Sequence, residues 1–172
     1  ASAAATLKLD AALSLLRQSG QQPPAGEVGS AIWLQGLVDA LCDLSSRDPL
    51  TGLANRRHFE LALAREIDRV ARVGEPALVL MVDIDRFKLV NDSLGHSTGD
   101  LLLQSVAKRL AHCTREEDTV ARLGGDEFVV LRSEVACAED AARAANALCA
   151  NIAAPHRIEG RGLRVTASVG IA

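Results

Sequence analysis

Two short stretches of the chain place acidic side chains where they could do chemistry. Asp83 and Asp85 lie at the end of an apolar run, and Asp126 and Glu127 follow two adjacent glycines in "GGDE". A turn that only reverses the chain more often reads Asn-Gly or Asp-Gly and needs no second acid. Acids that converge without a counter-charge repel one another. A divalent cation would remove this conflict.

Mg²⁺ suits such a site, because it prefers oxygen ligands, binds one or two carboxylates and fills its other positions with water and substrate phosphates. Two such ions about 4 Å apart can stabilise the attacking and the leaving oxygen of a phosphoryl displacement. The acids therefore indicate a nucleotide substrate. They also fit two solvated turns, since Asp and Gly are ordinary turn formers. Gly124 and Gly125 fit both interpretations, because glycine allows a positive φ and a close approach to the backbone.

Polar residues that follow the first pair of acids could bind such a nucleotide. Lys88 can supply a point charge to a phosphate. Asn91 and Asp100 could hydrogen-bond the edge of a base, and a carboxylate is a natural acceptor for the two adjacent N–H donors of guanine. None of these residues is diagnostic alone.

A sheet edge must bring these residues together. Residues 77–87 are almost continuously apolar, which predicts a central strand covered on both faces. Residues 118–133 predict a strand, a tight turn and a second strand. If this hairpin pairs with the central strand, as consecutive strands commonly do, three or four carboxylates meet at one edge.

Helices complete the second part of the chain. Asn55 can cap a helix from about Arg56 to Val73, with Gly74 ending it. Three further elements are an amphipathic helix over 97–113 with Ser97 or Thr98 as its cap, an Ala-rich helix over 137–152 and a final strand over 163–172. This order predicts an α+β fold, in which helices flank one face of a central, mainly antiparallel sheet.

The first part of the chain reads as an N-terminal helical stalk or linker region, residues 1–46. Residues 1–19 have helical periodicity and end in a Gly/Pro/Gln-rich linker. Between 28 and 44 an apolar stripe recurs every three or four residues and includes Trp33 and Leu37. The stripe must cover either the domain that follows or a second copy of itself, as in a coiled coil.

Composition bounds the class of protein. The 172 residues, 48% of them apolar and with a formal charge of -3, fit one globular domain with an appendage and argue against nonspecific binding to DNA or RNA. The four cysteines form no CxxC pair, which favours buried, reduced thiols in a cytoplasmic protein. No apolar run approaches the roughly 18 residues that cross a bilayer. The chain begins without Met, which indicates a piece cut from a larger, even membrane-attached, protein.

Three motifs together resemble the GGDEF domain of bacterial diguanylate cyclases, over residues 47–172. They are "RDPLTGLANRRHF", "DIDRFKLVNDSLGHSTGD" and "RLGGDEFVVL", in this order. The resemblance implies a palm-like fold related to nucleotidyl cyclases. It also implies that two GTP molecules are joined into cyclic di-GMP with release of two pyrophosphates, by two domains that meet face to face as a homodimer.

The resemblance also implies roles for individual residues. Asp83, the backbone carbonyl of Ile84 and Asp126 would hold Mg²⁺ or Mn²⁺, with Asp126 also the base for the 3′-hydroxyl and Glu127 near the second metal. Asn91 and Asp100 would contact guanine. Lys88 and the backbone around Phe87 would contact the phosphates. Gly124 and Gly125 would leave space for the substrate.

Arg115 and Asp118 have the RxxD spacing of the family's inhibitory product-binding site. An arginine can donate two hydrogen bonds to guanine O6 and N7. Without the resemblance, the pair would read as a surface ion pair worth less than about 1 kcal/mol. His96 is expected to pack and hydrogen-bond, and three residues are expected to fix the chain where the stalk meets the domain: Asp48, Asn55 and Arg56.

The main alternative is a catalytically inactive module that binds cyclic di-GMP. The intact "GGDEF" favours the enzyme, and a purely structural dimerisation domain leaves the acids unexplained. One departure is that the family continues past the last strand into a helix and strand carrying a lysine and an arginine for the GTP phosphates, whereas this chain ends at Ala172 and so looks truncated. An upstream sensory domain is expected.

Overall fold

A computed structural model describes residues 9–135 and 137–172, so the first residues of the helix predicted over 1–19 lie outside the described part. The chain divides into two units, Ala1–Arg47 and Asp48–Ala172. Among the described residues, no helix has both the length and the apolar character that a membrane span requires.

The first unit contains the helices α1 (Asp10–Gln18) and α2 (Ala31–Ser46). Ser30 caps α2, because its hydroxyl accepts a hydrogen bond from the backbone N–H of Trp33 (3.2 Å). Leu16 of α1 packs with Trp33 and Leu37 of α2, and all three are buried. The apolar stripe of α2 therefore packs against α1 within its own unit. The sequence had suggested that it covers either the domain that follows or a second copy of itself.

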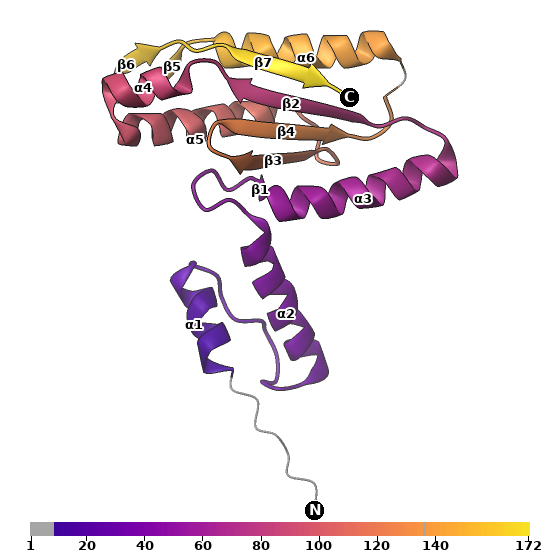
Figure 1. The fold of residues 1–172 in the computed structure, drawn as a ribbon. Coiled ribbons are helices and arrows are strands. Elements are labelled where there is room, and N and C mark those ends of the chain that lie inside the picture. The colour runs from indigo at the N-terminus through magenta and orange to yellow at the C-terminus, as the bar shows by residue number, and fades with distance from the viewer. Residues whose placement is uncertain (1–8, 136) are drawn as a thin grey trace, which may run out of the picture. The chain divides into compact units, whose positions relative to one another are not determined.

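The second unit is built on a five-stranded sheet in the order β1-β3-β4-β2-β7, and a separate hairpin joins β5 to β6 (Figure 1). The strand β1 is parallel to β3, and the other pairs in the sheet are antiparallel. The strands are β1 (Ala54–Asn55), β2 (Leu78–Ile84), β3 (Thr119–Gly124), β4 (Glu127–Arg132), β5 (His156–Ile158), β6 (Arg161–Leu163) and β7 (Ala167–Ile171). The predicted mainly antiparallel sheet, and the pairing of the hairpin with the central strand, are confirmed.

Four helices of the second unit cover both faces of this sheet. They are α3 (Arg56–Val73), α4 (Phe87–Leu94), α5 (His96–His112) and α6 (Ala138–Ala153). One face buries Val82 and Phe128 against α5 and α6, and the other buries Val129 against Phe59 of α3. The expectation that helices pack on one face only is therefore wrong. The reason is the run Phe128–Leu131, which is buried at every position and so needs cover on both faces.

The predicted bounds of α3 are confirmed. Asn55 accepts a hydrogen bond from the backbone N–H of His58 (3.0 Å), and Gly74 ends the helix with a φ of 80°. The predicted cap of α5 is wrong, because Gly95 precedes the helix and Thr98 donates its hydroxyl to the carbonyl of Leu94 (3.0 Å). The four cysteines are free, as predicted, but two of them are exposed: Cys42 and Cys137.

Candidate functional site

The strand pairing brings the predicted acids to one edge of the sheet. Asp83 at the end of β2 lies opposite Glu127, the first residue of β4. The backbone N–H of Ile84 faces the carbonyl of Asp126 at 3.4 Å. Partial burial raises the pKa of Asp83, and the negative charges of Asp126, Glu127 and Asp85 raise it further. The predicted convergence of acids is thus confirmed.

Asp85 has a different environment from the other acids. Its carboxylate accepts hydrogen bonds from the hydroxyls of Thr166 (2.5 Å) and Ser168 (2.7 Å), and its N–H donates to the carbonyl of Thr166 (2.9 Å). These hydrogen bonds lower the pKa of Asp85. Asp85 therefore fastens the end of β2 to β7. Sequence reasoning did not find Thr166 and Ser168, because their only signal is the alternation of polar and apolar residues in the last strand.

The remaining acids fit a magnesium site of the ordinary kind. Among residues 9–135 and 137–172, no group of three or more His, Cys, Asp or Glu side chains is arranged to hold a metal. Magnesium does not require such a group, because one or two carboxylates with a carbonyl, water and phosphates suffice. Asp83 and Asp126 provide two carboxylates, and a cation would neutralise the repulsion between Asp83 and the neighbouring acids Asp126, Glu127 and Asp85.

The turn between β3 and β4 depends on its two glycines. Gly124 has a φ of 141° and Gly125 a φ of 53°, and the pairing register shifts just before Gly124. A side chain at either position would be strained. The guanidinium of Arg122 donates to the carbonyl of Gly125 through Nε (3.0 Å) and Nη2 (2.8 Å). The shape of the turn is therefore fixed from within β3.

Arg122 also connects the turn to the first residue of the second unit. Its Nη1 donates to Oδ1 of Asp48 (3.2 Å), which also accepts from the N–H (2.9 Å) and hydroxyl (2.6 Å) of Thr51. Burial on its own raises the pKa of Asp48, but the hydrogen bonds from Thr51 and Arg122 outweigh it and hold the pKa below its usual value. Arg56 reaches the same turn, donating to the carbonyl of Leu123 (3.3 Å). Asp48 and Arg56 thus support the acidic turn as well as the start of the domain.

The predicted base-binding residues lie on two helices that pack together, α4 and α5. Asn91 is partly buried, and its Oδ1 is a buried acceptor with no hydrogen-bond partner among the described residues. A buried acceptor without a donor costs about 1–3 kcal/mol. Gly99 lies directly against this amide, and a Cβ there would clash with Oδ1. Asp100, the next residue on α5, is exposed. Both predicted base contacts therefore lie on the packed pair α4 and α5.

Open space adjoins the acids. A cavity of about 990 Å³ is lined by Asp83, Asp85 and Arg86 from the end of β2 and by Arg164 and Thr166 from the segment before β7. This volume is sufficient for a nucleotide-sized ligand. Arg86 adopts a φ of 57°, an uncommon conformation for a residue with a side chain, at the turn into α4. Sequence reasoning named neither arginine. Lys88 is exposed on α4, and His96 is also exposed, so the packing role expected for His96 is wrong.

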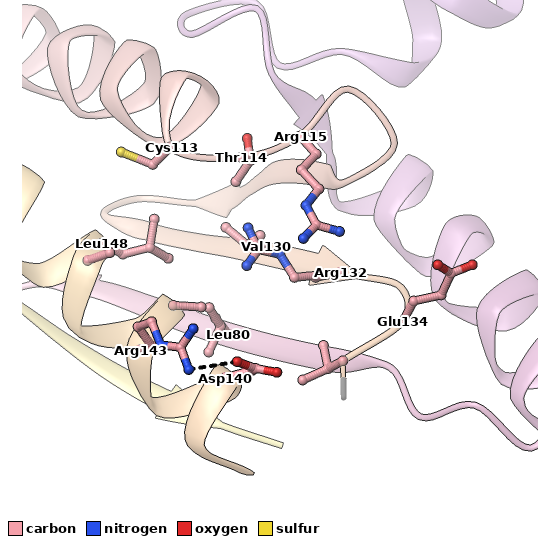
Figure 2. A pocket seen from close by; sticks show the side chains of 13 residues that line it. Leu80, Cys113, Thr114, Arg115, Val130, Arg132, Glu134, Asp140, Arg143 and Leu148 are labelled. Atoms are coloured by element: carbon pink, nitrogen blue, oxygen red, sulfur yellow. Dashed lines mark ion pairs between the residues drawn. The ribbon is translucent and has the colours of Figure 1, made fainter. Parts of the chain in front are cut away.

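Arg115 and Asp118 do not form a side-chain ion pair with each other. The side chain of Asp118 is 1% exposed, and its Oδ2 accepts from the backbone N–H of Arg115 (2.9 Å) and from Nε of Arg132 (3.1 Å). The guanidinium of Arg115 lies 3.9 Å from the carboxylate of Glu117 and lines a second cavity (Figure 2).

Comparison with known proteins gives consistent results. The family described as "Diguanylate cyclase, GGDEF domain" matches residues 45–172. Diguanylate cyclase TpbB of Pseudomonas aeruginosa is 41% identical over 144 residues, which cover 81% of this chain and 33% of TpbB. The chain therefore spans about a third of that relative.

Solved structures extend the comparison to the fold. The GGDEF domain of TpbB from Pseudomonas aeruginosa has a TM-score of 0.70 and 43% identity over 73% of each chain. The coiled coil and GGDEF domain of DgcB from Caulobacter crescentus, solved in complex with c-di-GMP, has a TM-score of 0.74. At 23% identity, and with 96% of this chain and 82% of that chain covered, it supports the fold alone.

Proposed function

The chain belongs to the diguanylate cyclase GGDEF domain family, and from this premise we propose that it condenses two GTP molecules into cyclic di-GMP with release of two pyrophosphates. The observation that carries the proposal is the convergence of Asp83, Asp126 and Glu127 at one edge of the sheet, where Asp83 lies opposite Glu127 and the N–H of Ile84 faces the carbonyl of Asp126. Such a cluster is well suited to divalent cations, and cations beside a nucleotide-sized cavity suit phosphoryl transfer.

In this reaction Asp83, the carbonyl of Ile84 and Asp126 would hold Mg²⁺ or Mn²⁺, with Glu127 beside them. The bound ion would neutralise charge on the α-phosphate and on the leaving pyrophosphate. Asp126 accepts the proton of the attacking 3′-hydroxyl as general base. Arg122 holds the carbonyl of Gly125 and so keeps Asp126 in place during the transfer.

The substrate is held by the neighbouring helices. Asn91 and Asp100 read the edge of guanine, and the buried, unpartnered Oδ1 of Asn91 would gain a donor from the base. Lys88 and the backbone around Phe87 contact phosphates. Gly124 and Gly125 leave space beside the acidic turn, where an added Cβ would meet no other atom within 4 Å.

Each domain holds one GTP, so a homodimer is required in which each 3′-hydroxyl attacks the α-phosphate bound by the partner. Product inhibition operates through Arg115 and Asp118. We expect the domain to act in the cytoplasm, where its four free thiols would stay reduced. Because the chain spans about a third of TpbB, an upstream sensory domain fits the remaining length.

The test is synthesis of cyclic di-GMP from GTP and Mg²⁺ at a protein concentration high enough for dimers, followed by chromatography. Asp126→Asn should lower the rate at least about 100-fold, the usual contribution of a general base. It should leave thermal unfolding nearly unchanged. Asp68→Asn, an exposed acid on α3, is the matched control.

Two outcomes would contradict parts of this assignment. Full activity of Asp126→Asn would remove Asp126 from its role as base. A wild-type protein that binds cyclic di-GMP but makes none would be a receptor rather than an enzyme.

A further inference from the structure

Two arginines from different segments line the cavity of about 990 Å³ that adjoins Asp83. Arg86 lies at the turn from β2 into α4, and Arg164 lies between β6 and β7. Both residues are exposed. The cavity therefore offers two guanidinium groups to a ligand that also reaches the acids.

In the part of the chain that the structure describes, neither arginine is paired with a carboxylate. Its ion pairs involve six other arginines: Arg56, Arg69, Arg115, Arg122, Arg132 and Arg143. Asp85 lines the same cavity, but both of its oxygens accept hydrogen bonds from hydroxyls, those of Thr166 and Ser168. Arg86 acts on this carboxylate only through its positive charge. The two guanidinium groups therefore keep their N–H donors for a ligand.

The backbone at Arg86 fixes the turn that presents its side chain. With a φ of 57° the residue is in the left-handed region, which residues with side chains rarely adopt. Its carbonyl accepts a hydrogen bond from the N–H of Leu89 (2.9 Å) as α4 begins. A strained conformation of this kind persists only where the surrounding structure holds it, and such residues are common at ligand sites.

The strand order places the cavity and the acidic turn on opposite sides of Asp83. In the sheet β2 lies between β4 and β7 (Figure 1). Asp83 pairs with Glu127 of β4 on one side and with Ser168 of β7 on the other. Among the described residues, those that line the cavity include 163–166, just before β7, and neither acid of the turn between β3 and β4. The cavity is therefore on the β7 side.

The chemistry of the transfer then assigns the end of the triphosphate to this cavity. The 3′-oxygen forms a bond to the α-phosphorus while the bond from that phosphorus to the pyrophosphate oxygen breaks, and the two oxygens are roughly in line. Asp126 takes the proton of the hydroxyl, so the attack comes from the side of the turn. Pyrophosphate leaves with the electron pair on the opposite side, which is the side of the cavity.

Guanidinium groups suit a leaving pyrophosphate. Their planar fork donates two parallel hydrogen bonds to phosphate oxygens. The pyrophosphate gains negative charge as its bond to the α-phosphorus breaks, and fixed positive groups stabilise charge where it develops.

We propose that Arg86 and Arg164 bind the γ-phosphate of GTP and then hold the leaving pyrophosphate, so that they distinguish GTP from GDP. The inference rests on the proposed function. It adds two side chains to the phosphate contacts proposed for Lys88 and the backbone around Phe87.

The experiment is calorimetric titration of the whole chain, with Mg²⁺, against 3′-deoxy-GTP and 3′-deoxy-GDP, which lack the attacking hydroxyl and are not turned over. Arg86→Gln and Arg164→Gln should each weaken binding of the triphosphate about tenfold, the loss expected for a hydrogen bond to a charged group, and change binding of the diphosphate less than about twofold. Arg161→Gln, which removes an exposed arginine of β6 outside the cavity, should bind both like the wild type.

Two further measurements separate a phosphate contact from a structural effect. Arg86→Lys and Arg164→Lys should recover part of the lost binding, because lysine keeps the charge without the planar fork. Inorganic pyrophosphate should compete with 3′-deoxy-GTP about tenfold less well in the glutamine variants than in the wild type. Thermal unfolding checks the fold of each variant. Equal weakening of both nucleotides, unchanged binding of the triphosphate or unchanged competition by pyrophosphate would overturn the proposal.

The two proposals can fail separately. A protein that makes cyclic di-GMP from GTP, but whose arginine variants bind the triphosphate like the wild type, would overturn the present inference and leave the diguanylate cyclase assignment intact. A protein that makes no cyclic di-GMP, but whose variants lose the preference for the triphosphate, would remove that assignment and support the phosphate site. A wild type that binds neither nucleotide would overturn both.

Discussion

Asp83 is the single residue at which the repulsion between the acids is most evident. Its pKa is raised by burial and by three neighbouring carboxylates. The folded protein therefore binds a proton at Asp83 at higher pH than the unfolded chain does. The stability linked to this proton is present below the unfolded pKa and is lost as pH rises through the folded pKa. At neutral pH, ionised Asp83 lowers stability.

Asp83→Asn should accordingly raise the melting temperature slightly at pH 7.5 without metal, since it removes the repulsion. It should also abolish the further rise that Mg²⁺ causes in the wild type, because the cation loses a ligand. Thermal unfolding with and without Mg²⁺ measures both effects, and Asp68→Asn should behave like the wild type. An equal Mg²⁺ effect in Asp83→Asn and wild type would contradict the metal site.

Gly99 is the second residue with a sharp prediction, because a Cβ at this position would clash with Oδ1 of Asn91. Gly99→Ala should displace Asn91 and weaken GTP binding about tenfold, the loss expected when one buried hydrogen bond fails. Calorimetric titration with GTP measures this. Gly162→Ala, where a Cβ would meet no atom within 4 Å, should bind normally. Normal GTP binding by Gly99→Ala would argue against Asn91 as a base contact.

Residue types and spacing were sufficient to predict that Asp83 and Asp126 converge, because strand pairing places them. The environments of Asp85 and Asp118 were not predictable in the same way. Asp85 is bound by Thr166, 81 positions along the chain, and Asp118 by Arg132 on a neighbouring strand. Nothing local marks either partner.

At the level of elements, the junction of α5, α6 and β5 depends on a buried histidine. His156 is fully buried, with Nδ1 2.8 Å from the hydroxyl of Ser105 and Nε2 2.8 Å from the carbonyl of Ile152. Arg109 binds the end of α6 beside it, donating to the carbonyl of Ala154 (2.6 Å). Burial lowers the pKa of His156. The folded protein therefore favours the neutral ring.

The stability that comes from neutral His156 should be complete above the unfolded pKa of about 6.5 and should decline as pH falls towards the folded pKa. Urea unfolding of the wild type should give a lower free energy of unfolding at pH 5.5 than at pH 7.5. This loss should be smaller in His156→Gln. His58→Gln, an exposed histidine, should keep the wild-type loss. The same loss in His156→Gln as in the wild type would exclude His156 as its source.

Long elements with strong signals were the most predictable. Asn55 and Gly74 marked both ends of α3 correctly, because cap chemistry is local. The short elements β1, α4, β5 and β6 were not predicted, since none carries enough periodic residues to stand out. In α3, Ile67 is 59% exposed although it lies at helical spacing from the buried Phe59, whereas Glu66 is buried and accepts a hydrogen bond from Arg69 (2.9 Å). The pairing of Glu66 with Arg69 therefore overrides the burial that the apolar periodicity of the helix predicts.

For the whole molecule, the predicted site lies entirely in the second unit, from Asp83 to Glu127. The first unit has its own small core around Leu16, Trp33 and Leu37. Because this core is separate from the two clusters that cover the faces of the sheet, we expect two separable unfolding events. A shortened chain of residues 48–172 should keep the event that belongs to the sheet.

The position of Trp33 makes this separation measurable by spectroscopy. The protein has one tryptophan, no tyrosine and three phenylalanines. Trp33 is 2% exposed in the first unit, and its indole N–H donates to the carbonyl of Pro24 (3.0 Å). Tryptophan emission therefore observes the first unit alone, whereas far-ultraviolet circular dichroism is dominated by the larger second unit. Urea transitions from the two signals should not coincide, and coincident curves would show a single cooperative unit. Residues 48–172 contain no tryptophan, so fluorescent GTP analogues can be followed in the shortened chain without background from the protein.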